Sequence, residues 1–97
     1  MTTHIVMWNF KDELSEKERT EAGRLIKEKL EAVTSQVPGV IDLKVIINEL
    51  ESSNRDLMLY GTFETIEALN GYQIHPAHIE AATYVKSKTQ DRVCFDY

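Results

Sequence analysis

The chain has 97 residues, of which 42% are apolar, and this composition fits one folded domain rather than two domains or a disordered segment. A domain of this size buries only about 60–65% of the surface that its unfolded chain exposes, so association with a partner would add stability. Sixteen acidic residues exceed eleven basic ones, and the net charge is −5 without any basic cluster. We therefore expect neither nucleic acid nor a membrane surface as a partner.

The cysteine content and the amino terminus indicate where the protein resides. Cys94 is the only cysteine, which excludes an internal disulfide, and the first residues lack the apolar stretch of a signal peptide. No apolar run approaches the ~20 residues that cross a bilayer. The sequence therefore predicts a cytoplasmic protein that forms one domain over residues 1–97.

The first elements in chain order are a strand and a helix. Residues 4–10 are rich in β-branched and aromatic types, which predicts a strand. Ser15 and Glu18 have the spacing of a capping box and mark the start of a helix. Pro38 and Gly39 end it. Apolar residues recur between these signals at helical spacing: Ala22, Ile26, Leu30, Val33 and Val37.

Two strands are predicted next. Residues 40–48 alternate in polarity, and residues 56–63 form another strand-like run. The short polar connection predicts an antiparallel hairpin. One side of the first of these strands carries Ile41, Leu43, Val45 and Ile47.

The last third of the chain predicts a broken helical region and a final strand. Thr65 caps a helical stretch that is interrupted near Asn70 and Gly71, and Pro76 starts a further helix. The apolar face of this further helix is expected to contain Ile79, Ala82 and Val85. Residues 92–97 form the final strand.

The element order is β-α-β-β-α-β, which predicts an α+β, ferredoxin-like domain with both helical regions on one face of a four-stranded antiparallel sheet. The other face is also apolar, because Ile5 and Met7 of the first strand and Met58 and Tyr60 of the third would point there. An uncovered apolar sheet face is typical of an association site. We therefore predict a homodimer that packs sheet against sheet.

The segment from Tyr72 to His78 is the densest cluster of residues that could carry chemistry. An imidazole titrating near neutral pH can accept a proton, while a phenol donates or polarises. Asp96 on the final strand could fix the tautomer of one imidazole, and His4 could join from the first strand. These residues indicate acid–base chemistry, although a purely structural role for the same residues remains an alternative.

Other chemistries are less favoured. His75 and His78 with a carboxylate would make an incomplete two-histidine metal site, but no established metal-ligand spacing supports it, and no metal is predicted. Cys94 is interpreted as a small hydrophobic strand residue. No glycine-rich phosphate loop occurs, so we expect no nucleotide cofactor, and no cofactor of another kind is predicted.

The chain resembles the stress-responsive A/B-barrel (Dabb) domain family over essentially its whole length. The resemblance is carried by three segments: His4 to Lys11, Tyr72 to His78, and Asp91 to Tyr97. The resemblance implies a ferredoxin-like protomer that forms a homodimeric α/β barrel, and a link to stress responses. One characterised member is a plant polyketide cyclase that performs an intramolecular aldol condensation without a cofactor. By this resemblance, Tyr72 and His78 would be a catalytic pair, Asp96 would be the partner of His78, and His4 would lie in the pocket.

The resemblance also implies a pocket between sheet and helices. In this sequence we expect further ligand contacts from five residues: Val6, Trp8, Ile26, Leu59 and Arg92. The arginine favours an anionic ligand. The favoured function is binding of a small organic ligand by a homodimer. The alternatives are a cofactor-free cyclase or lyase acting through Tyr72 and His78, and a dimer with no ligand.

Overall fold

The computed structural model describes all residues, 1–97, and its elements follow the predicted order, with the second helical region divided into two helices. The strands form one antiparallel sheet in the order β2-β3-β1-β4, which confirms the ferredoxin-like α+β fold. The elements are β1 (Thr2–Phe10), α1 (Glu16–Ala32), the 3₁₀ turn η1 (Val33–Ser35), β2 (Val40–Ile47), β3 (Leu57–Phe63), α2 (Ile66–Ile74), α3 (Pro76–Lys88) and β4 (Thr89–Asp96).

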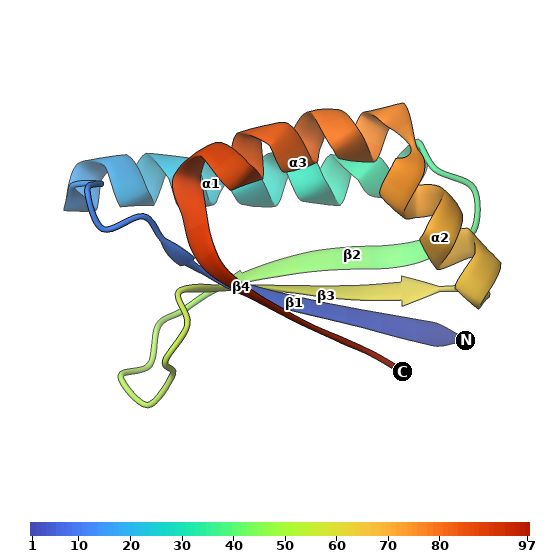
Figure 1. Cartoon of the computed structure of the whole chain (residues 1–97), viewed down its shortest axis with the longest axis horizontal. Helices are drawn as coiled ribbons and strands as arrows, with labels where there is room; N and C mark the ends of the chain where they lie inside the picture. Colours follow the sequence, from blue (N-terminus) through green and yellow to red (C-terminus); the bar gives the residue numbers. More distant parts are fainter.

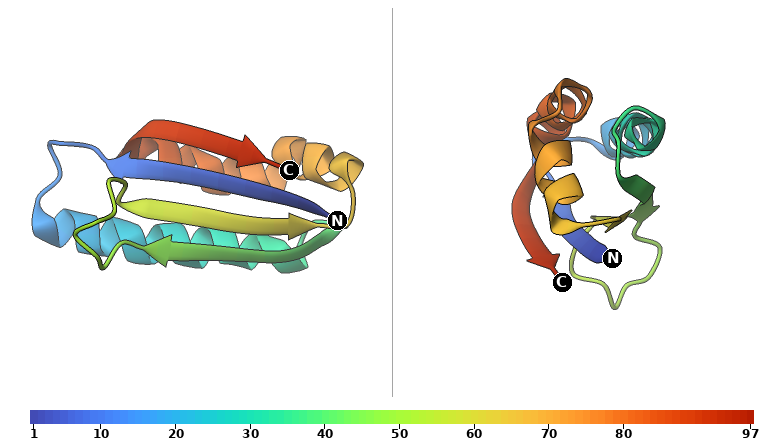
Figure 2. Two further views of the ribbon diagram at one scale, coloured as in Figure 1. Left: turned by 90° about the horizontal axis from the view of Figure 1, so that it is seen from below. Right: turned by 90° about the vertical axis from the view of Figure 1, so that its right-hand side faces the viewer.

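The helices all lie on one side of the sheet. Helices α1 and α3 run side by side along the strands, and α2 covers one end of the sheet (Figure 1). Seen from the opposite side, the four strands lie uncovered in front of the helices (Figure 2, left). The hydrophobic core therefore occupies the space between the two layers, where Ile26 of α1 and Phe63 of β3 have no exposed surface.

Helix α1 begins at the predicted capping box. The Ser15 hydroxyl accepts a hydrogen bond from the Glu18 backbone N–H at 3.1 Å, and the Glu18 carboxylate accepts one from the Ser15 N–H at 3.0 Å. Ala22, Ile26 and Leu30 follow at helical spacing and are buried against the sheet.

The turn that leads from α1 and η1 into β2 requires glycine. Gly39 has a φ of 82°, a value that residues with a side chain rarely adopt. A Cβ atom at this position would lie only 2.5 Å from the Cβ of Ala68 on α2. The missing side chain thus allows the turn to pack directly against α2.

Three predictions about the helices are wrong. Helix α1 ends at Ala32 and is followed by η1, instead of continuing to Pro38. Helix α2 continues without interruption through Asn70 and Gly71, because a single glycine in a helix costs only about 1 kcal/mol and tertiary packing can compensate for it. In α3, Val85 is buried and Ala82 lines the cavity, both as predicted, but Ile79 is 51% exposed and Ala81 is buried instead. The apolar face of α3 is therefore rotated from the predicted one.

The strands also differ locally from their predicted form. A register shift between Val40 and Asp42 leaves Ile41 as an extra residue in β2, so that Ile41 is 46% exposed instead of facing the core. Leu43 and Val45 are buried as predicted. Strand β4 begins at Thr89, three residues before the predicted start.

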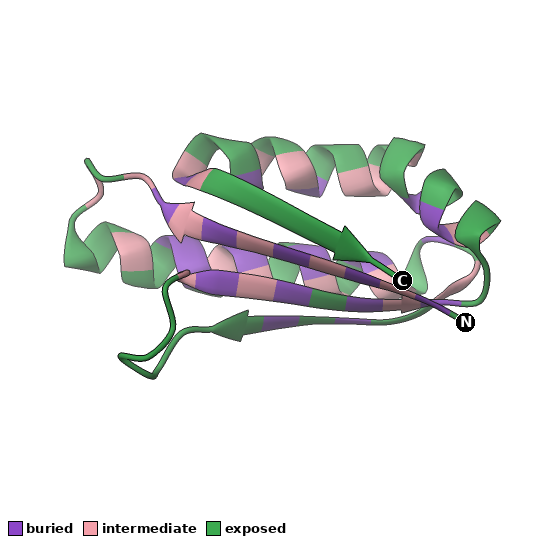
Figure 3. Cartoon of the chain, turned by 60° about the horizontal axis from the view of Figure 1, so that its bottom comes forward, coloured by how far each residue is buried: buried purple, intermediate pink, exposed green.

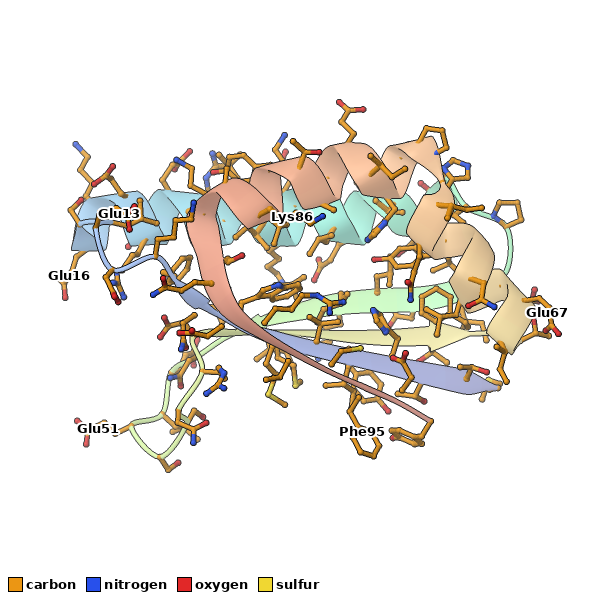
Figure 4. The ribbon with its side chains drawn as sticks, in the orientation of Figure 1. Glu13, Glu16, Glu51, Glu67, Lys86 and Phe95 are labelled. Atoms are coloured by element: carbon orange, nitrogen blue, oxygen red, sulfur yellow. The ribbon has the colours of Figure 1, made fainter.

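The uncovered face of the sheet carries apolar side chains in register. One row across the four strands consists of Ile46, Met58, Met7 and Val93, and the next of Lys44, Tyr60, Ile5 and Phe95. Phe95 is 67% exposed and lies on the side of the sheet away from the helices (Figure 4), and most of β4 is exposed (Figure 3). No helix in the structure combines the length and the apolar character that a membrane span requires.

Candidate functional site

A cavity of about 390 Å³ lies between the inner face of the sheet and the helices. On the sheet side of the cavity, three strands contribute lining residues: His4, Val6 and Trp8 from β1, Leu59 from β3, and Arg92 from β4. Helices α1 and α2 contribute Leu30, Tyr72 and Gln73. Helix α3 contributes His78, Ala82, Val85 and Lys86, and the Lys86 side chain extends from α3 toward the sheet (Figure 4).

Most of the residues predicted to contact a ligand line this cavity, but Ile26 does not. Ile26 is fully buried in the core, whereas Leu30, one helical turn further along α1, reaches the cavity. The sequence could not distinguish the two because both lie on the same apolar stripe of the helix. Sequence reasoning also missed Lys86, which follows Ala82 by one turn of α3 and lines the cavity, because a lysine gives no sequence signal of a place beside a cavity.

Tyr72 and His78 face each other in the cavity. Tyr72 belongs to α2, and His78 is the third residue of α3, which begins at Pro76. The His75 Nδ1 accepts a hydrogen bond from the Ala77 N–H at 3.1 Å and caps this helix. The ring centres of Tyr72 and His78 are 4.2 Å apart, and the His78 Nδ1 lies 3.2 Å from the Gln73 carbonyl oxygen. The short bend between α2 and α3 thus brings the two side chains together.

Burial changes the protonation behaviour of both rings. Burial raises the pKa of Tyr72, so its hydroxyl keeps its proton at neutral pH. Burial also lowers the pKa of His78, and the positive groups of Lys86 and Arg92 act in the same direction, against the smaller raising effect of the Gln73 carbonyl. The Tyr72 hydroxyl is fully buried and has no hydrogen-bond partner. The pair therefore combines an unpaired donor with an imidazole that favours its neutral form.

Asp96 has a different partner from the one expected. The Asp96 carboxylate hydrogen-bonds the Nδ1 of His4, and His78 uses its own Nδ1 on the Gln73 carbonyl. The register explains the difference, because His4 on β1 and Asp96 on β4 are directly opposed in neighbouring antiparallel strands. The predicted Asp96–His78 pair is therefore wrong.

Strand β4 presents Arg92 to the cavity through an irregularity in its pairing with β1. The register shifts between Met7 and Asn9, and Asp91 opposite this point has a φ of 57°. The Asp91 carboxylate accepts a hydrogen bond from the Asn9 side chain at 3.0 Å. No ion pair with a carboxylate is formed by Arg92, and none of the residues that line the cavity is acidic.

Cys94 lies further along β4. Its Sγ is 3.5 Å from Asp96 Oδ1 and 3.8 Å from His4 Nδ1. Burial and the neighbouring Asp96 carboxylate raise the pKa of this thiol. The free thiol is therefore protonated at neutral pH and is not an activated nucleophile.

Comparison with known proteins identifies a family and an enzyme relative. The family model described as the stress responsive A/B barrel domain (Dabb) matches residues 2–97. Olivetolic acid cyclase from Cannabis sativa is 27% identical over 97 residues, which cover 97% of this chain and 92% of that enzyme.

Solved structures share the fold. A dimeric protein of unknown function with a ferredoxin-like fold from Bacteroides fragilis superposes with a TM-score of 0.92 at 24% identity, covering 99% of this chain and 93% of that one. Hydroxynitrile lyase from Passiflora edulis superposes with a TM-score of 0.78 at 17% identity, covering 99% of this chain and 90% of that one.

Proposed function

Because this chain belongs to the stress responsive A/B barrel domain family, we propose that it is a homodimeric protein whose cavity binds a small organic acid. The cavity volume of about 390 Å³ lies within the usual range for small-molecule sites. Its walls are mainly apolar, and Val6, Trp8 and Leu59 form the part contributed by the sheet. Such walls suit the carbon skeleton of the ligand.

The single observation that carries this proposal is the unpaired hydroxyl of Tyr72. A buried polar group without a partner costs about 1–3 kcal/mol, and buried groups are therefore nearly always hydrogen-bonded. Tyr72 is one of the residues that line the cavity, and we infer that its hydroxyl donates a hydrogen bond to an oxygen atom of a ligand bound there. A ligand that supplies this acceptor removes the cost and gains affinity from it.

The charges around the cavity favour an anionic ligand. Lys86 and Arg92 both line it without an acidic neighbour in the lining, although the chain as a whole carries a net charge of −5. A carboxylate can form charge-assisted hydrogen bonds with both cations, and an arginine can bind it through two parallel bonds. We therefore expect the acid group near Lys86 and Arg92, and another oxygen near Tyr72.

The dimer is proposed from the uncovered sheet face. One apolar row extends across all four strands, and the next includes Tyr60 and Phe95, which would otherwise remain in water. The proteins of similar fold from Bacteroides fragilis and Thermobifida fusca are described as dimeric. Native mass spectrometry of freshly purified protein tests both halves of the proposal, since it reports the dimer mass and any co-purified ligand.

Binding of an acid is tested with 1-naphthoate and its neutral counterpart 1-naphthamide by isothermal titration calorimetry. We expect naphthoate to bind more tightly, and Lys86→Gln or Arg92→Gln to reduce this preference by roughly tenfold, since each removes one charge-assisted bond. Lys88→Gln, which removes a charge on the same helix outside the cavity, is the control. Equal affinities for the two probes in the native protein, or equal effects of all three variants, would contradict the proposal.

Cofactor-free acid–base catalysis is the second candidate, and the neutral imidazole of His78 beside Tyr72 favours it. A neutral imidazole can remove a proton from carbon between two carbonyl groups, and the protonated Tyr72 hydroxyl can donate a hydrogen bond to the enolate oxygen that forms. The related sequence of olivetolic acid cyclase is that of an enzyme.

This candidate predicts accelerated exchange of the α-protons of a small β-diketone with deuterated water, followed by NMR. The rate above background should fall by roughly 100-fold in His78→Ala and should remain in His75→Ala. An equal rate in the native protein and His78→Ala would exclude His78 as the base while leaving ligand binding untouched.

A further inference from the structure

Three side chains from the first and last strands bring metal-ligating atoms together at the end of the sheet. The Nδ1 of His4, the Sγ of Cys94 and one carboxylate oxygen of Asp96 lie within 4.8 Å of one another. The sulfur is 3.8 Å from the His4 nitrogen and 3.5 Å from the Asp96 oxygen, and His4 and Asp96 are hydrogen-bonded. Nitrogen, sulfur and oxygen donors thus converge on one point.

The sheet positions these donors before any ion binds. His4 and Asp96 are directly opposed in the β1–β4 pairing, and Cys94 is two residues before Asp96, so its side chain projects from the same face. The His4 ring is 3% exposed and is held by edge contacts with Phe63 and Tyr72, whose ring centres lie 6.2 and 6.3 Å away. One ligand is therefore fixed, and two are exposed and accessible to an ion from solution.

We propose that His4, Cys94 and Asp96 form a binding site for a zinc-like divalent metal ion. Zinc takes thiolate, imidazole and carboxylate ligands at ~2.0–2.3 Å in tetrahedral geometry, which places the ligand atoms roughly 3.3–3.6 Å apart. The two sulfur distances are close to this range, whereas His4 Nδ1 and Asp96 Oδ1 are hydrogen-bonded to each other and move apart to ligate the same ion. On binding, the ion takes the place of the proton between His4 and Asp96, that proton is carried on Nε2 of the same imidazole, and the Cys94 thiol releases its proton to solvent.

The donor set selects among metals. Magnesium and calcium prefer oxygen ligands throughout, whereas a set with one thiolate and one imidazole suits zinc and similar transition metals. Three protein ligands leave the fourth tetrahedral position free for water or an added group, as in zinc sites that are not purely structural. This site shares His4 with the wall of the cavity, but the groups proposed to hold the acid, Lys86, Arg92 and the Tyr72 hydroxyl, take no part in it.

Cobalt(II) is the probe that tests the site, because a thiolate bound to cobalt gives an intense near-ultraviolet charge-transfer band. Chelator-treated protein in a phosphine reductant is titrated with Co²⁺, and Zn²⁺ is then added in competition. We expect one Co²⁺ per protomer, a thiolate band, and displacement by Zn²⁺. In Cys94→Ser the band should disappear and Zn²⁺ affinity should fall by roughly 100-fold, because a hydroxyl is a poor replacement for a thiolate ligand.

His75→Ala is the matched control, since it removes a histidine outside the cluster and should leave the band and the affinity unchanged. Cys94 is exposed, so Cys94→Ser should fold normally, and circular dichroism checks this. Absence of a thiolate band in the native protein overturns the proposal. Equal Zn²⁺ affinity in Cys94→Ser, or an equal loss in His75→Ala, also overturns it and indicates binding at other surface groups.

Discussion

His4 and Asp96, 92 positions apart in the chain, are hydrogen-bonded across the pairing of β1 with β4. The imidazole is almost fully buried, while 40% of the Asp96 side chain is exposed. This bond joins the first strand to the last and holds one wall of the cavity, because His4 lines it. The pair therefore connects the stability of the sheet edge with the geometry of the candidate site.

Replacement of Asp96 by alanine should destabilise the protein. The buried Nδ1 of His4 would lose its charged partner, and we expect the free energy of unfolding to fall by about 1–2 kcal/mol. Urea denaturation at neutral pH measures this change. Asp12→Ala, at an exposed turn residue, should change stability by less than about 0.5 kcal/mol, and similar losses in the two variants would contradict the role of the pair.

The lowered pKa of His78 makes stability depend on pH. The unfolded chain binds a proton to this residue below about pH 6.5, while the folded protein resists it. The contribution of His78 is therefore fully present above this pH and is lost as the pH falls through the lower, folded-state pKa. Besides burial, the neighbouring residues that lower the pKa of His78 in the folded protein are His4 of β1, Lys86 of α3 and Arg92 of β4.

Urea denaturation at pH 7.5 and pH 5.5 checks this pH dependence. The loss of stability on acidification should be smaller in His78→Gln, which cannot titrate, than in the native protein. His75→Gln, which removes the neighbouring histidine at the start of α3, should retain the full loss. Identical pH dependence of the native protein and His78→Gln would show that His78 titrates alike in the folded and unfolded chain.

The two glycines near α2 should respond oppositely to alanine. Gly39→Ala should lower stability by more than about 1 kcal/mol, since it combines a positive φ with a contact at 2.5 Å to Ala68. Gly71→Ala, within α2 and with open space around it, should raise stability by about 0.5–1 kcal/mol. Thermal unfolding followed by circular dichroism compares them, and destabilisation by Gly71→Ala would contradict the open surroundings found there.

The proposed dimer predicts a specific sensitivity of the uncovered sheet face. Phe95→Glu would place a charge in the apolar row and should shift the protein toward monomer in sedimentation equilibrium, weakening association by roughly tenfold or more. Ile79→Glu is the matched control, because Ile79 is comparably exposed on α3 and lies on the helical side. Equal effects of the two substitutions, or a native protein that is monomeric at micromolar concentration, would refute the sheet-to-sheet arrangement.

Local signals explain why much of the fold could be predicted. Ser15 and Glu18 form a capping box from neighbouring atoms, and Pro76 begins a helix by its own fixed φ, so both boundaries depend on few residues. The rotation of α3 and the extra residue Ile41 in β2 were missed, because packing against other elements decides them. A pattern of alternating or helical spacing predicts an element but not the exact angle at which it meets the core.

In the candidate site, too, some features follow from the local sequence and others from tertiary packing. The sequence alone determined the element order, the closeness of Tyr72 to His78 across one short bend, and the apolar character of both sheet faces, because these depend on local spacing and residue type. Only the tertiary structure decided that Asp96 pairs with His4, that Lys86 reaches the cavity while Ile26 does not, and that Cys94 joins two other potential ligands. Those relationships depend on strand register and helix rotation, which the packing of the whole chain fixes.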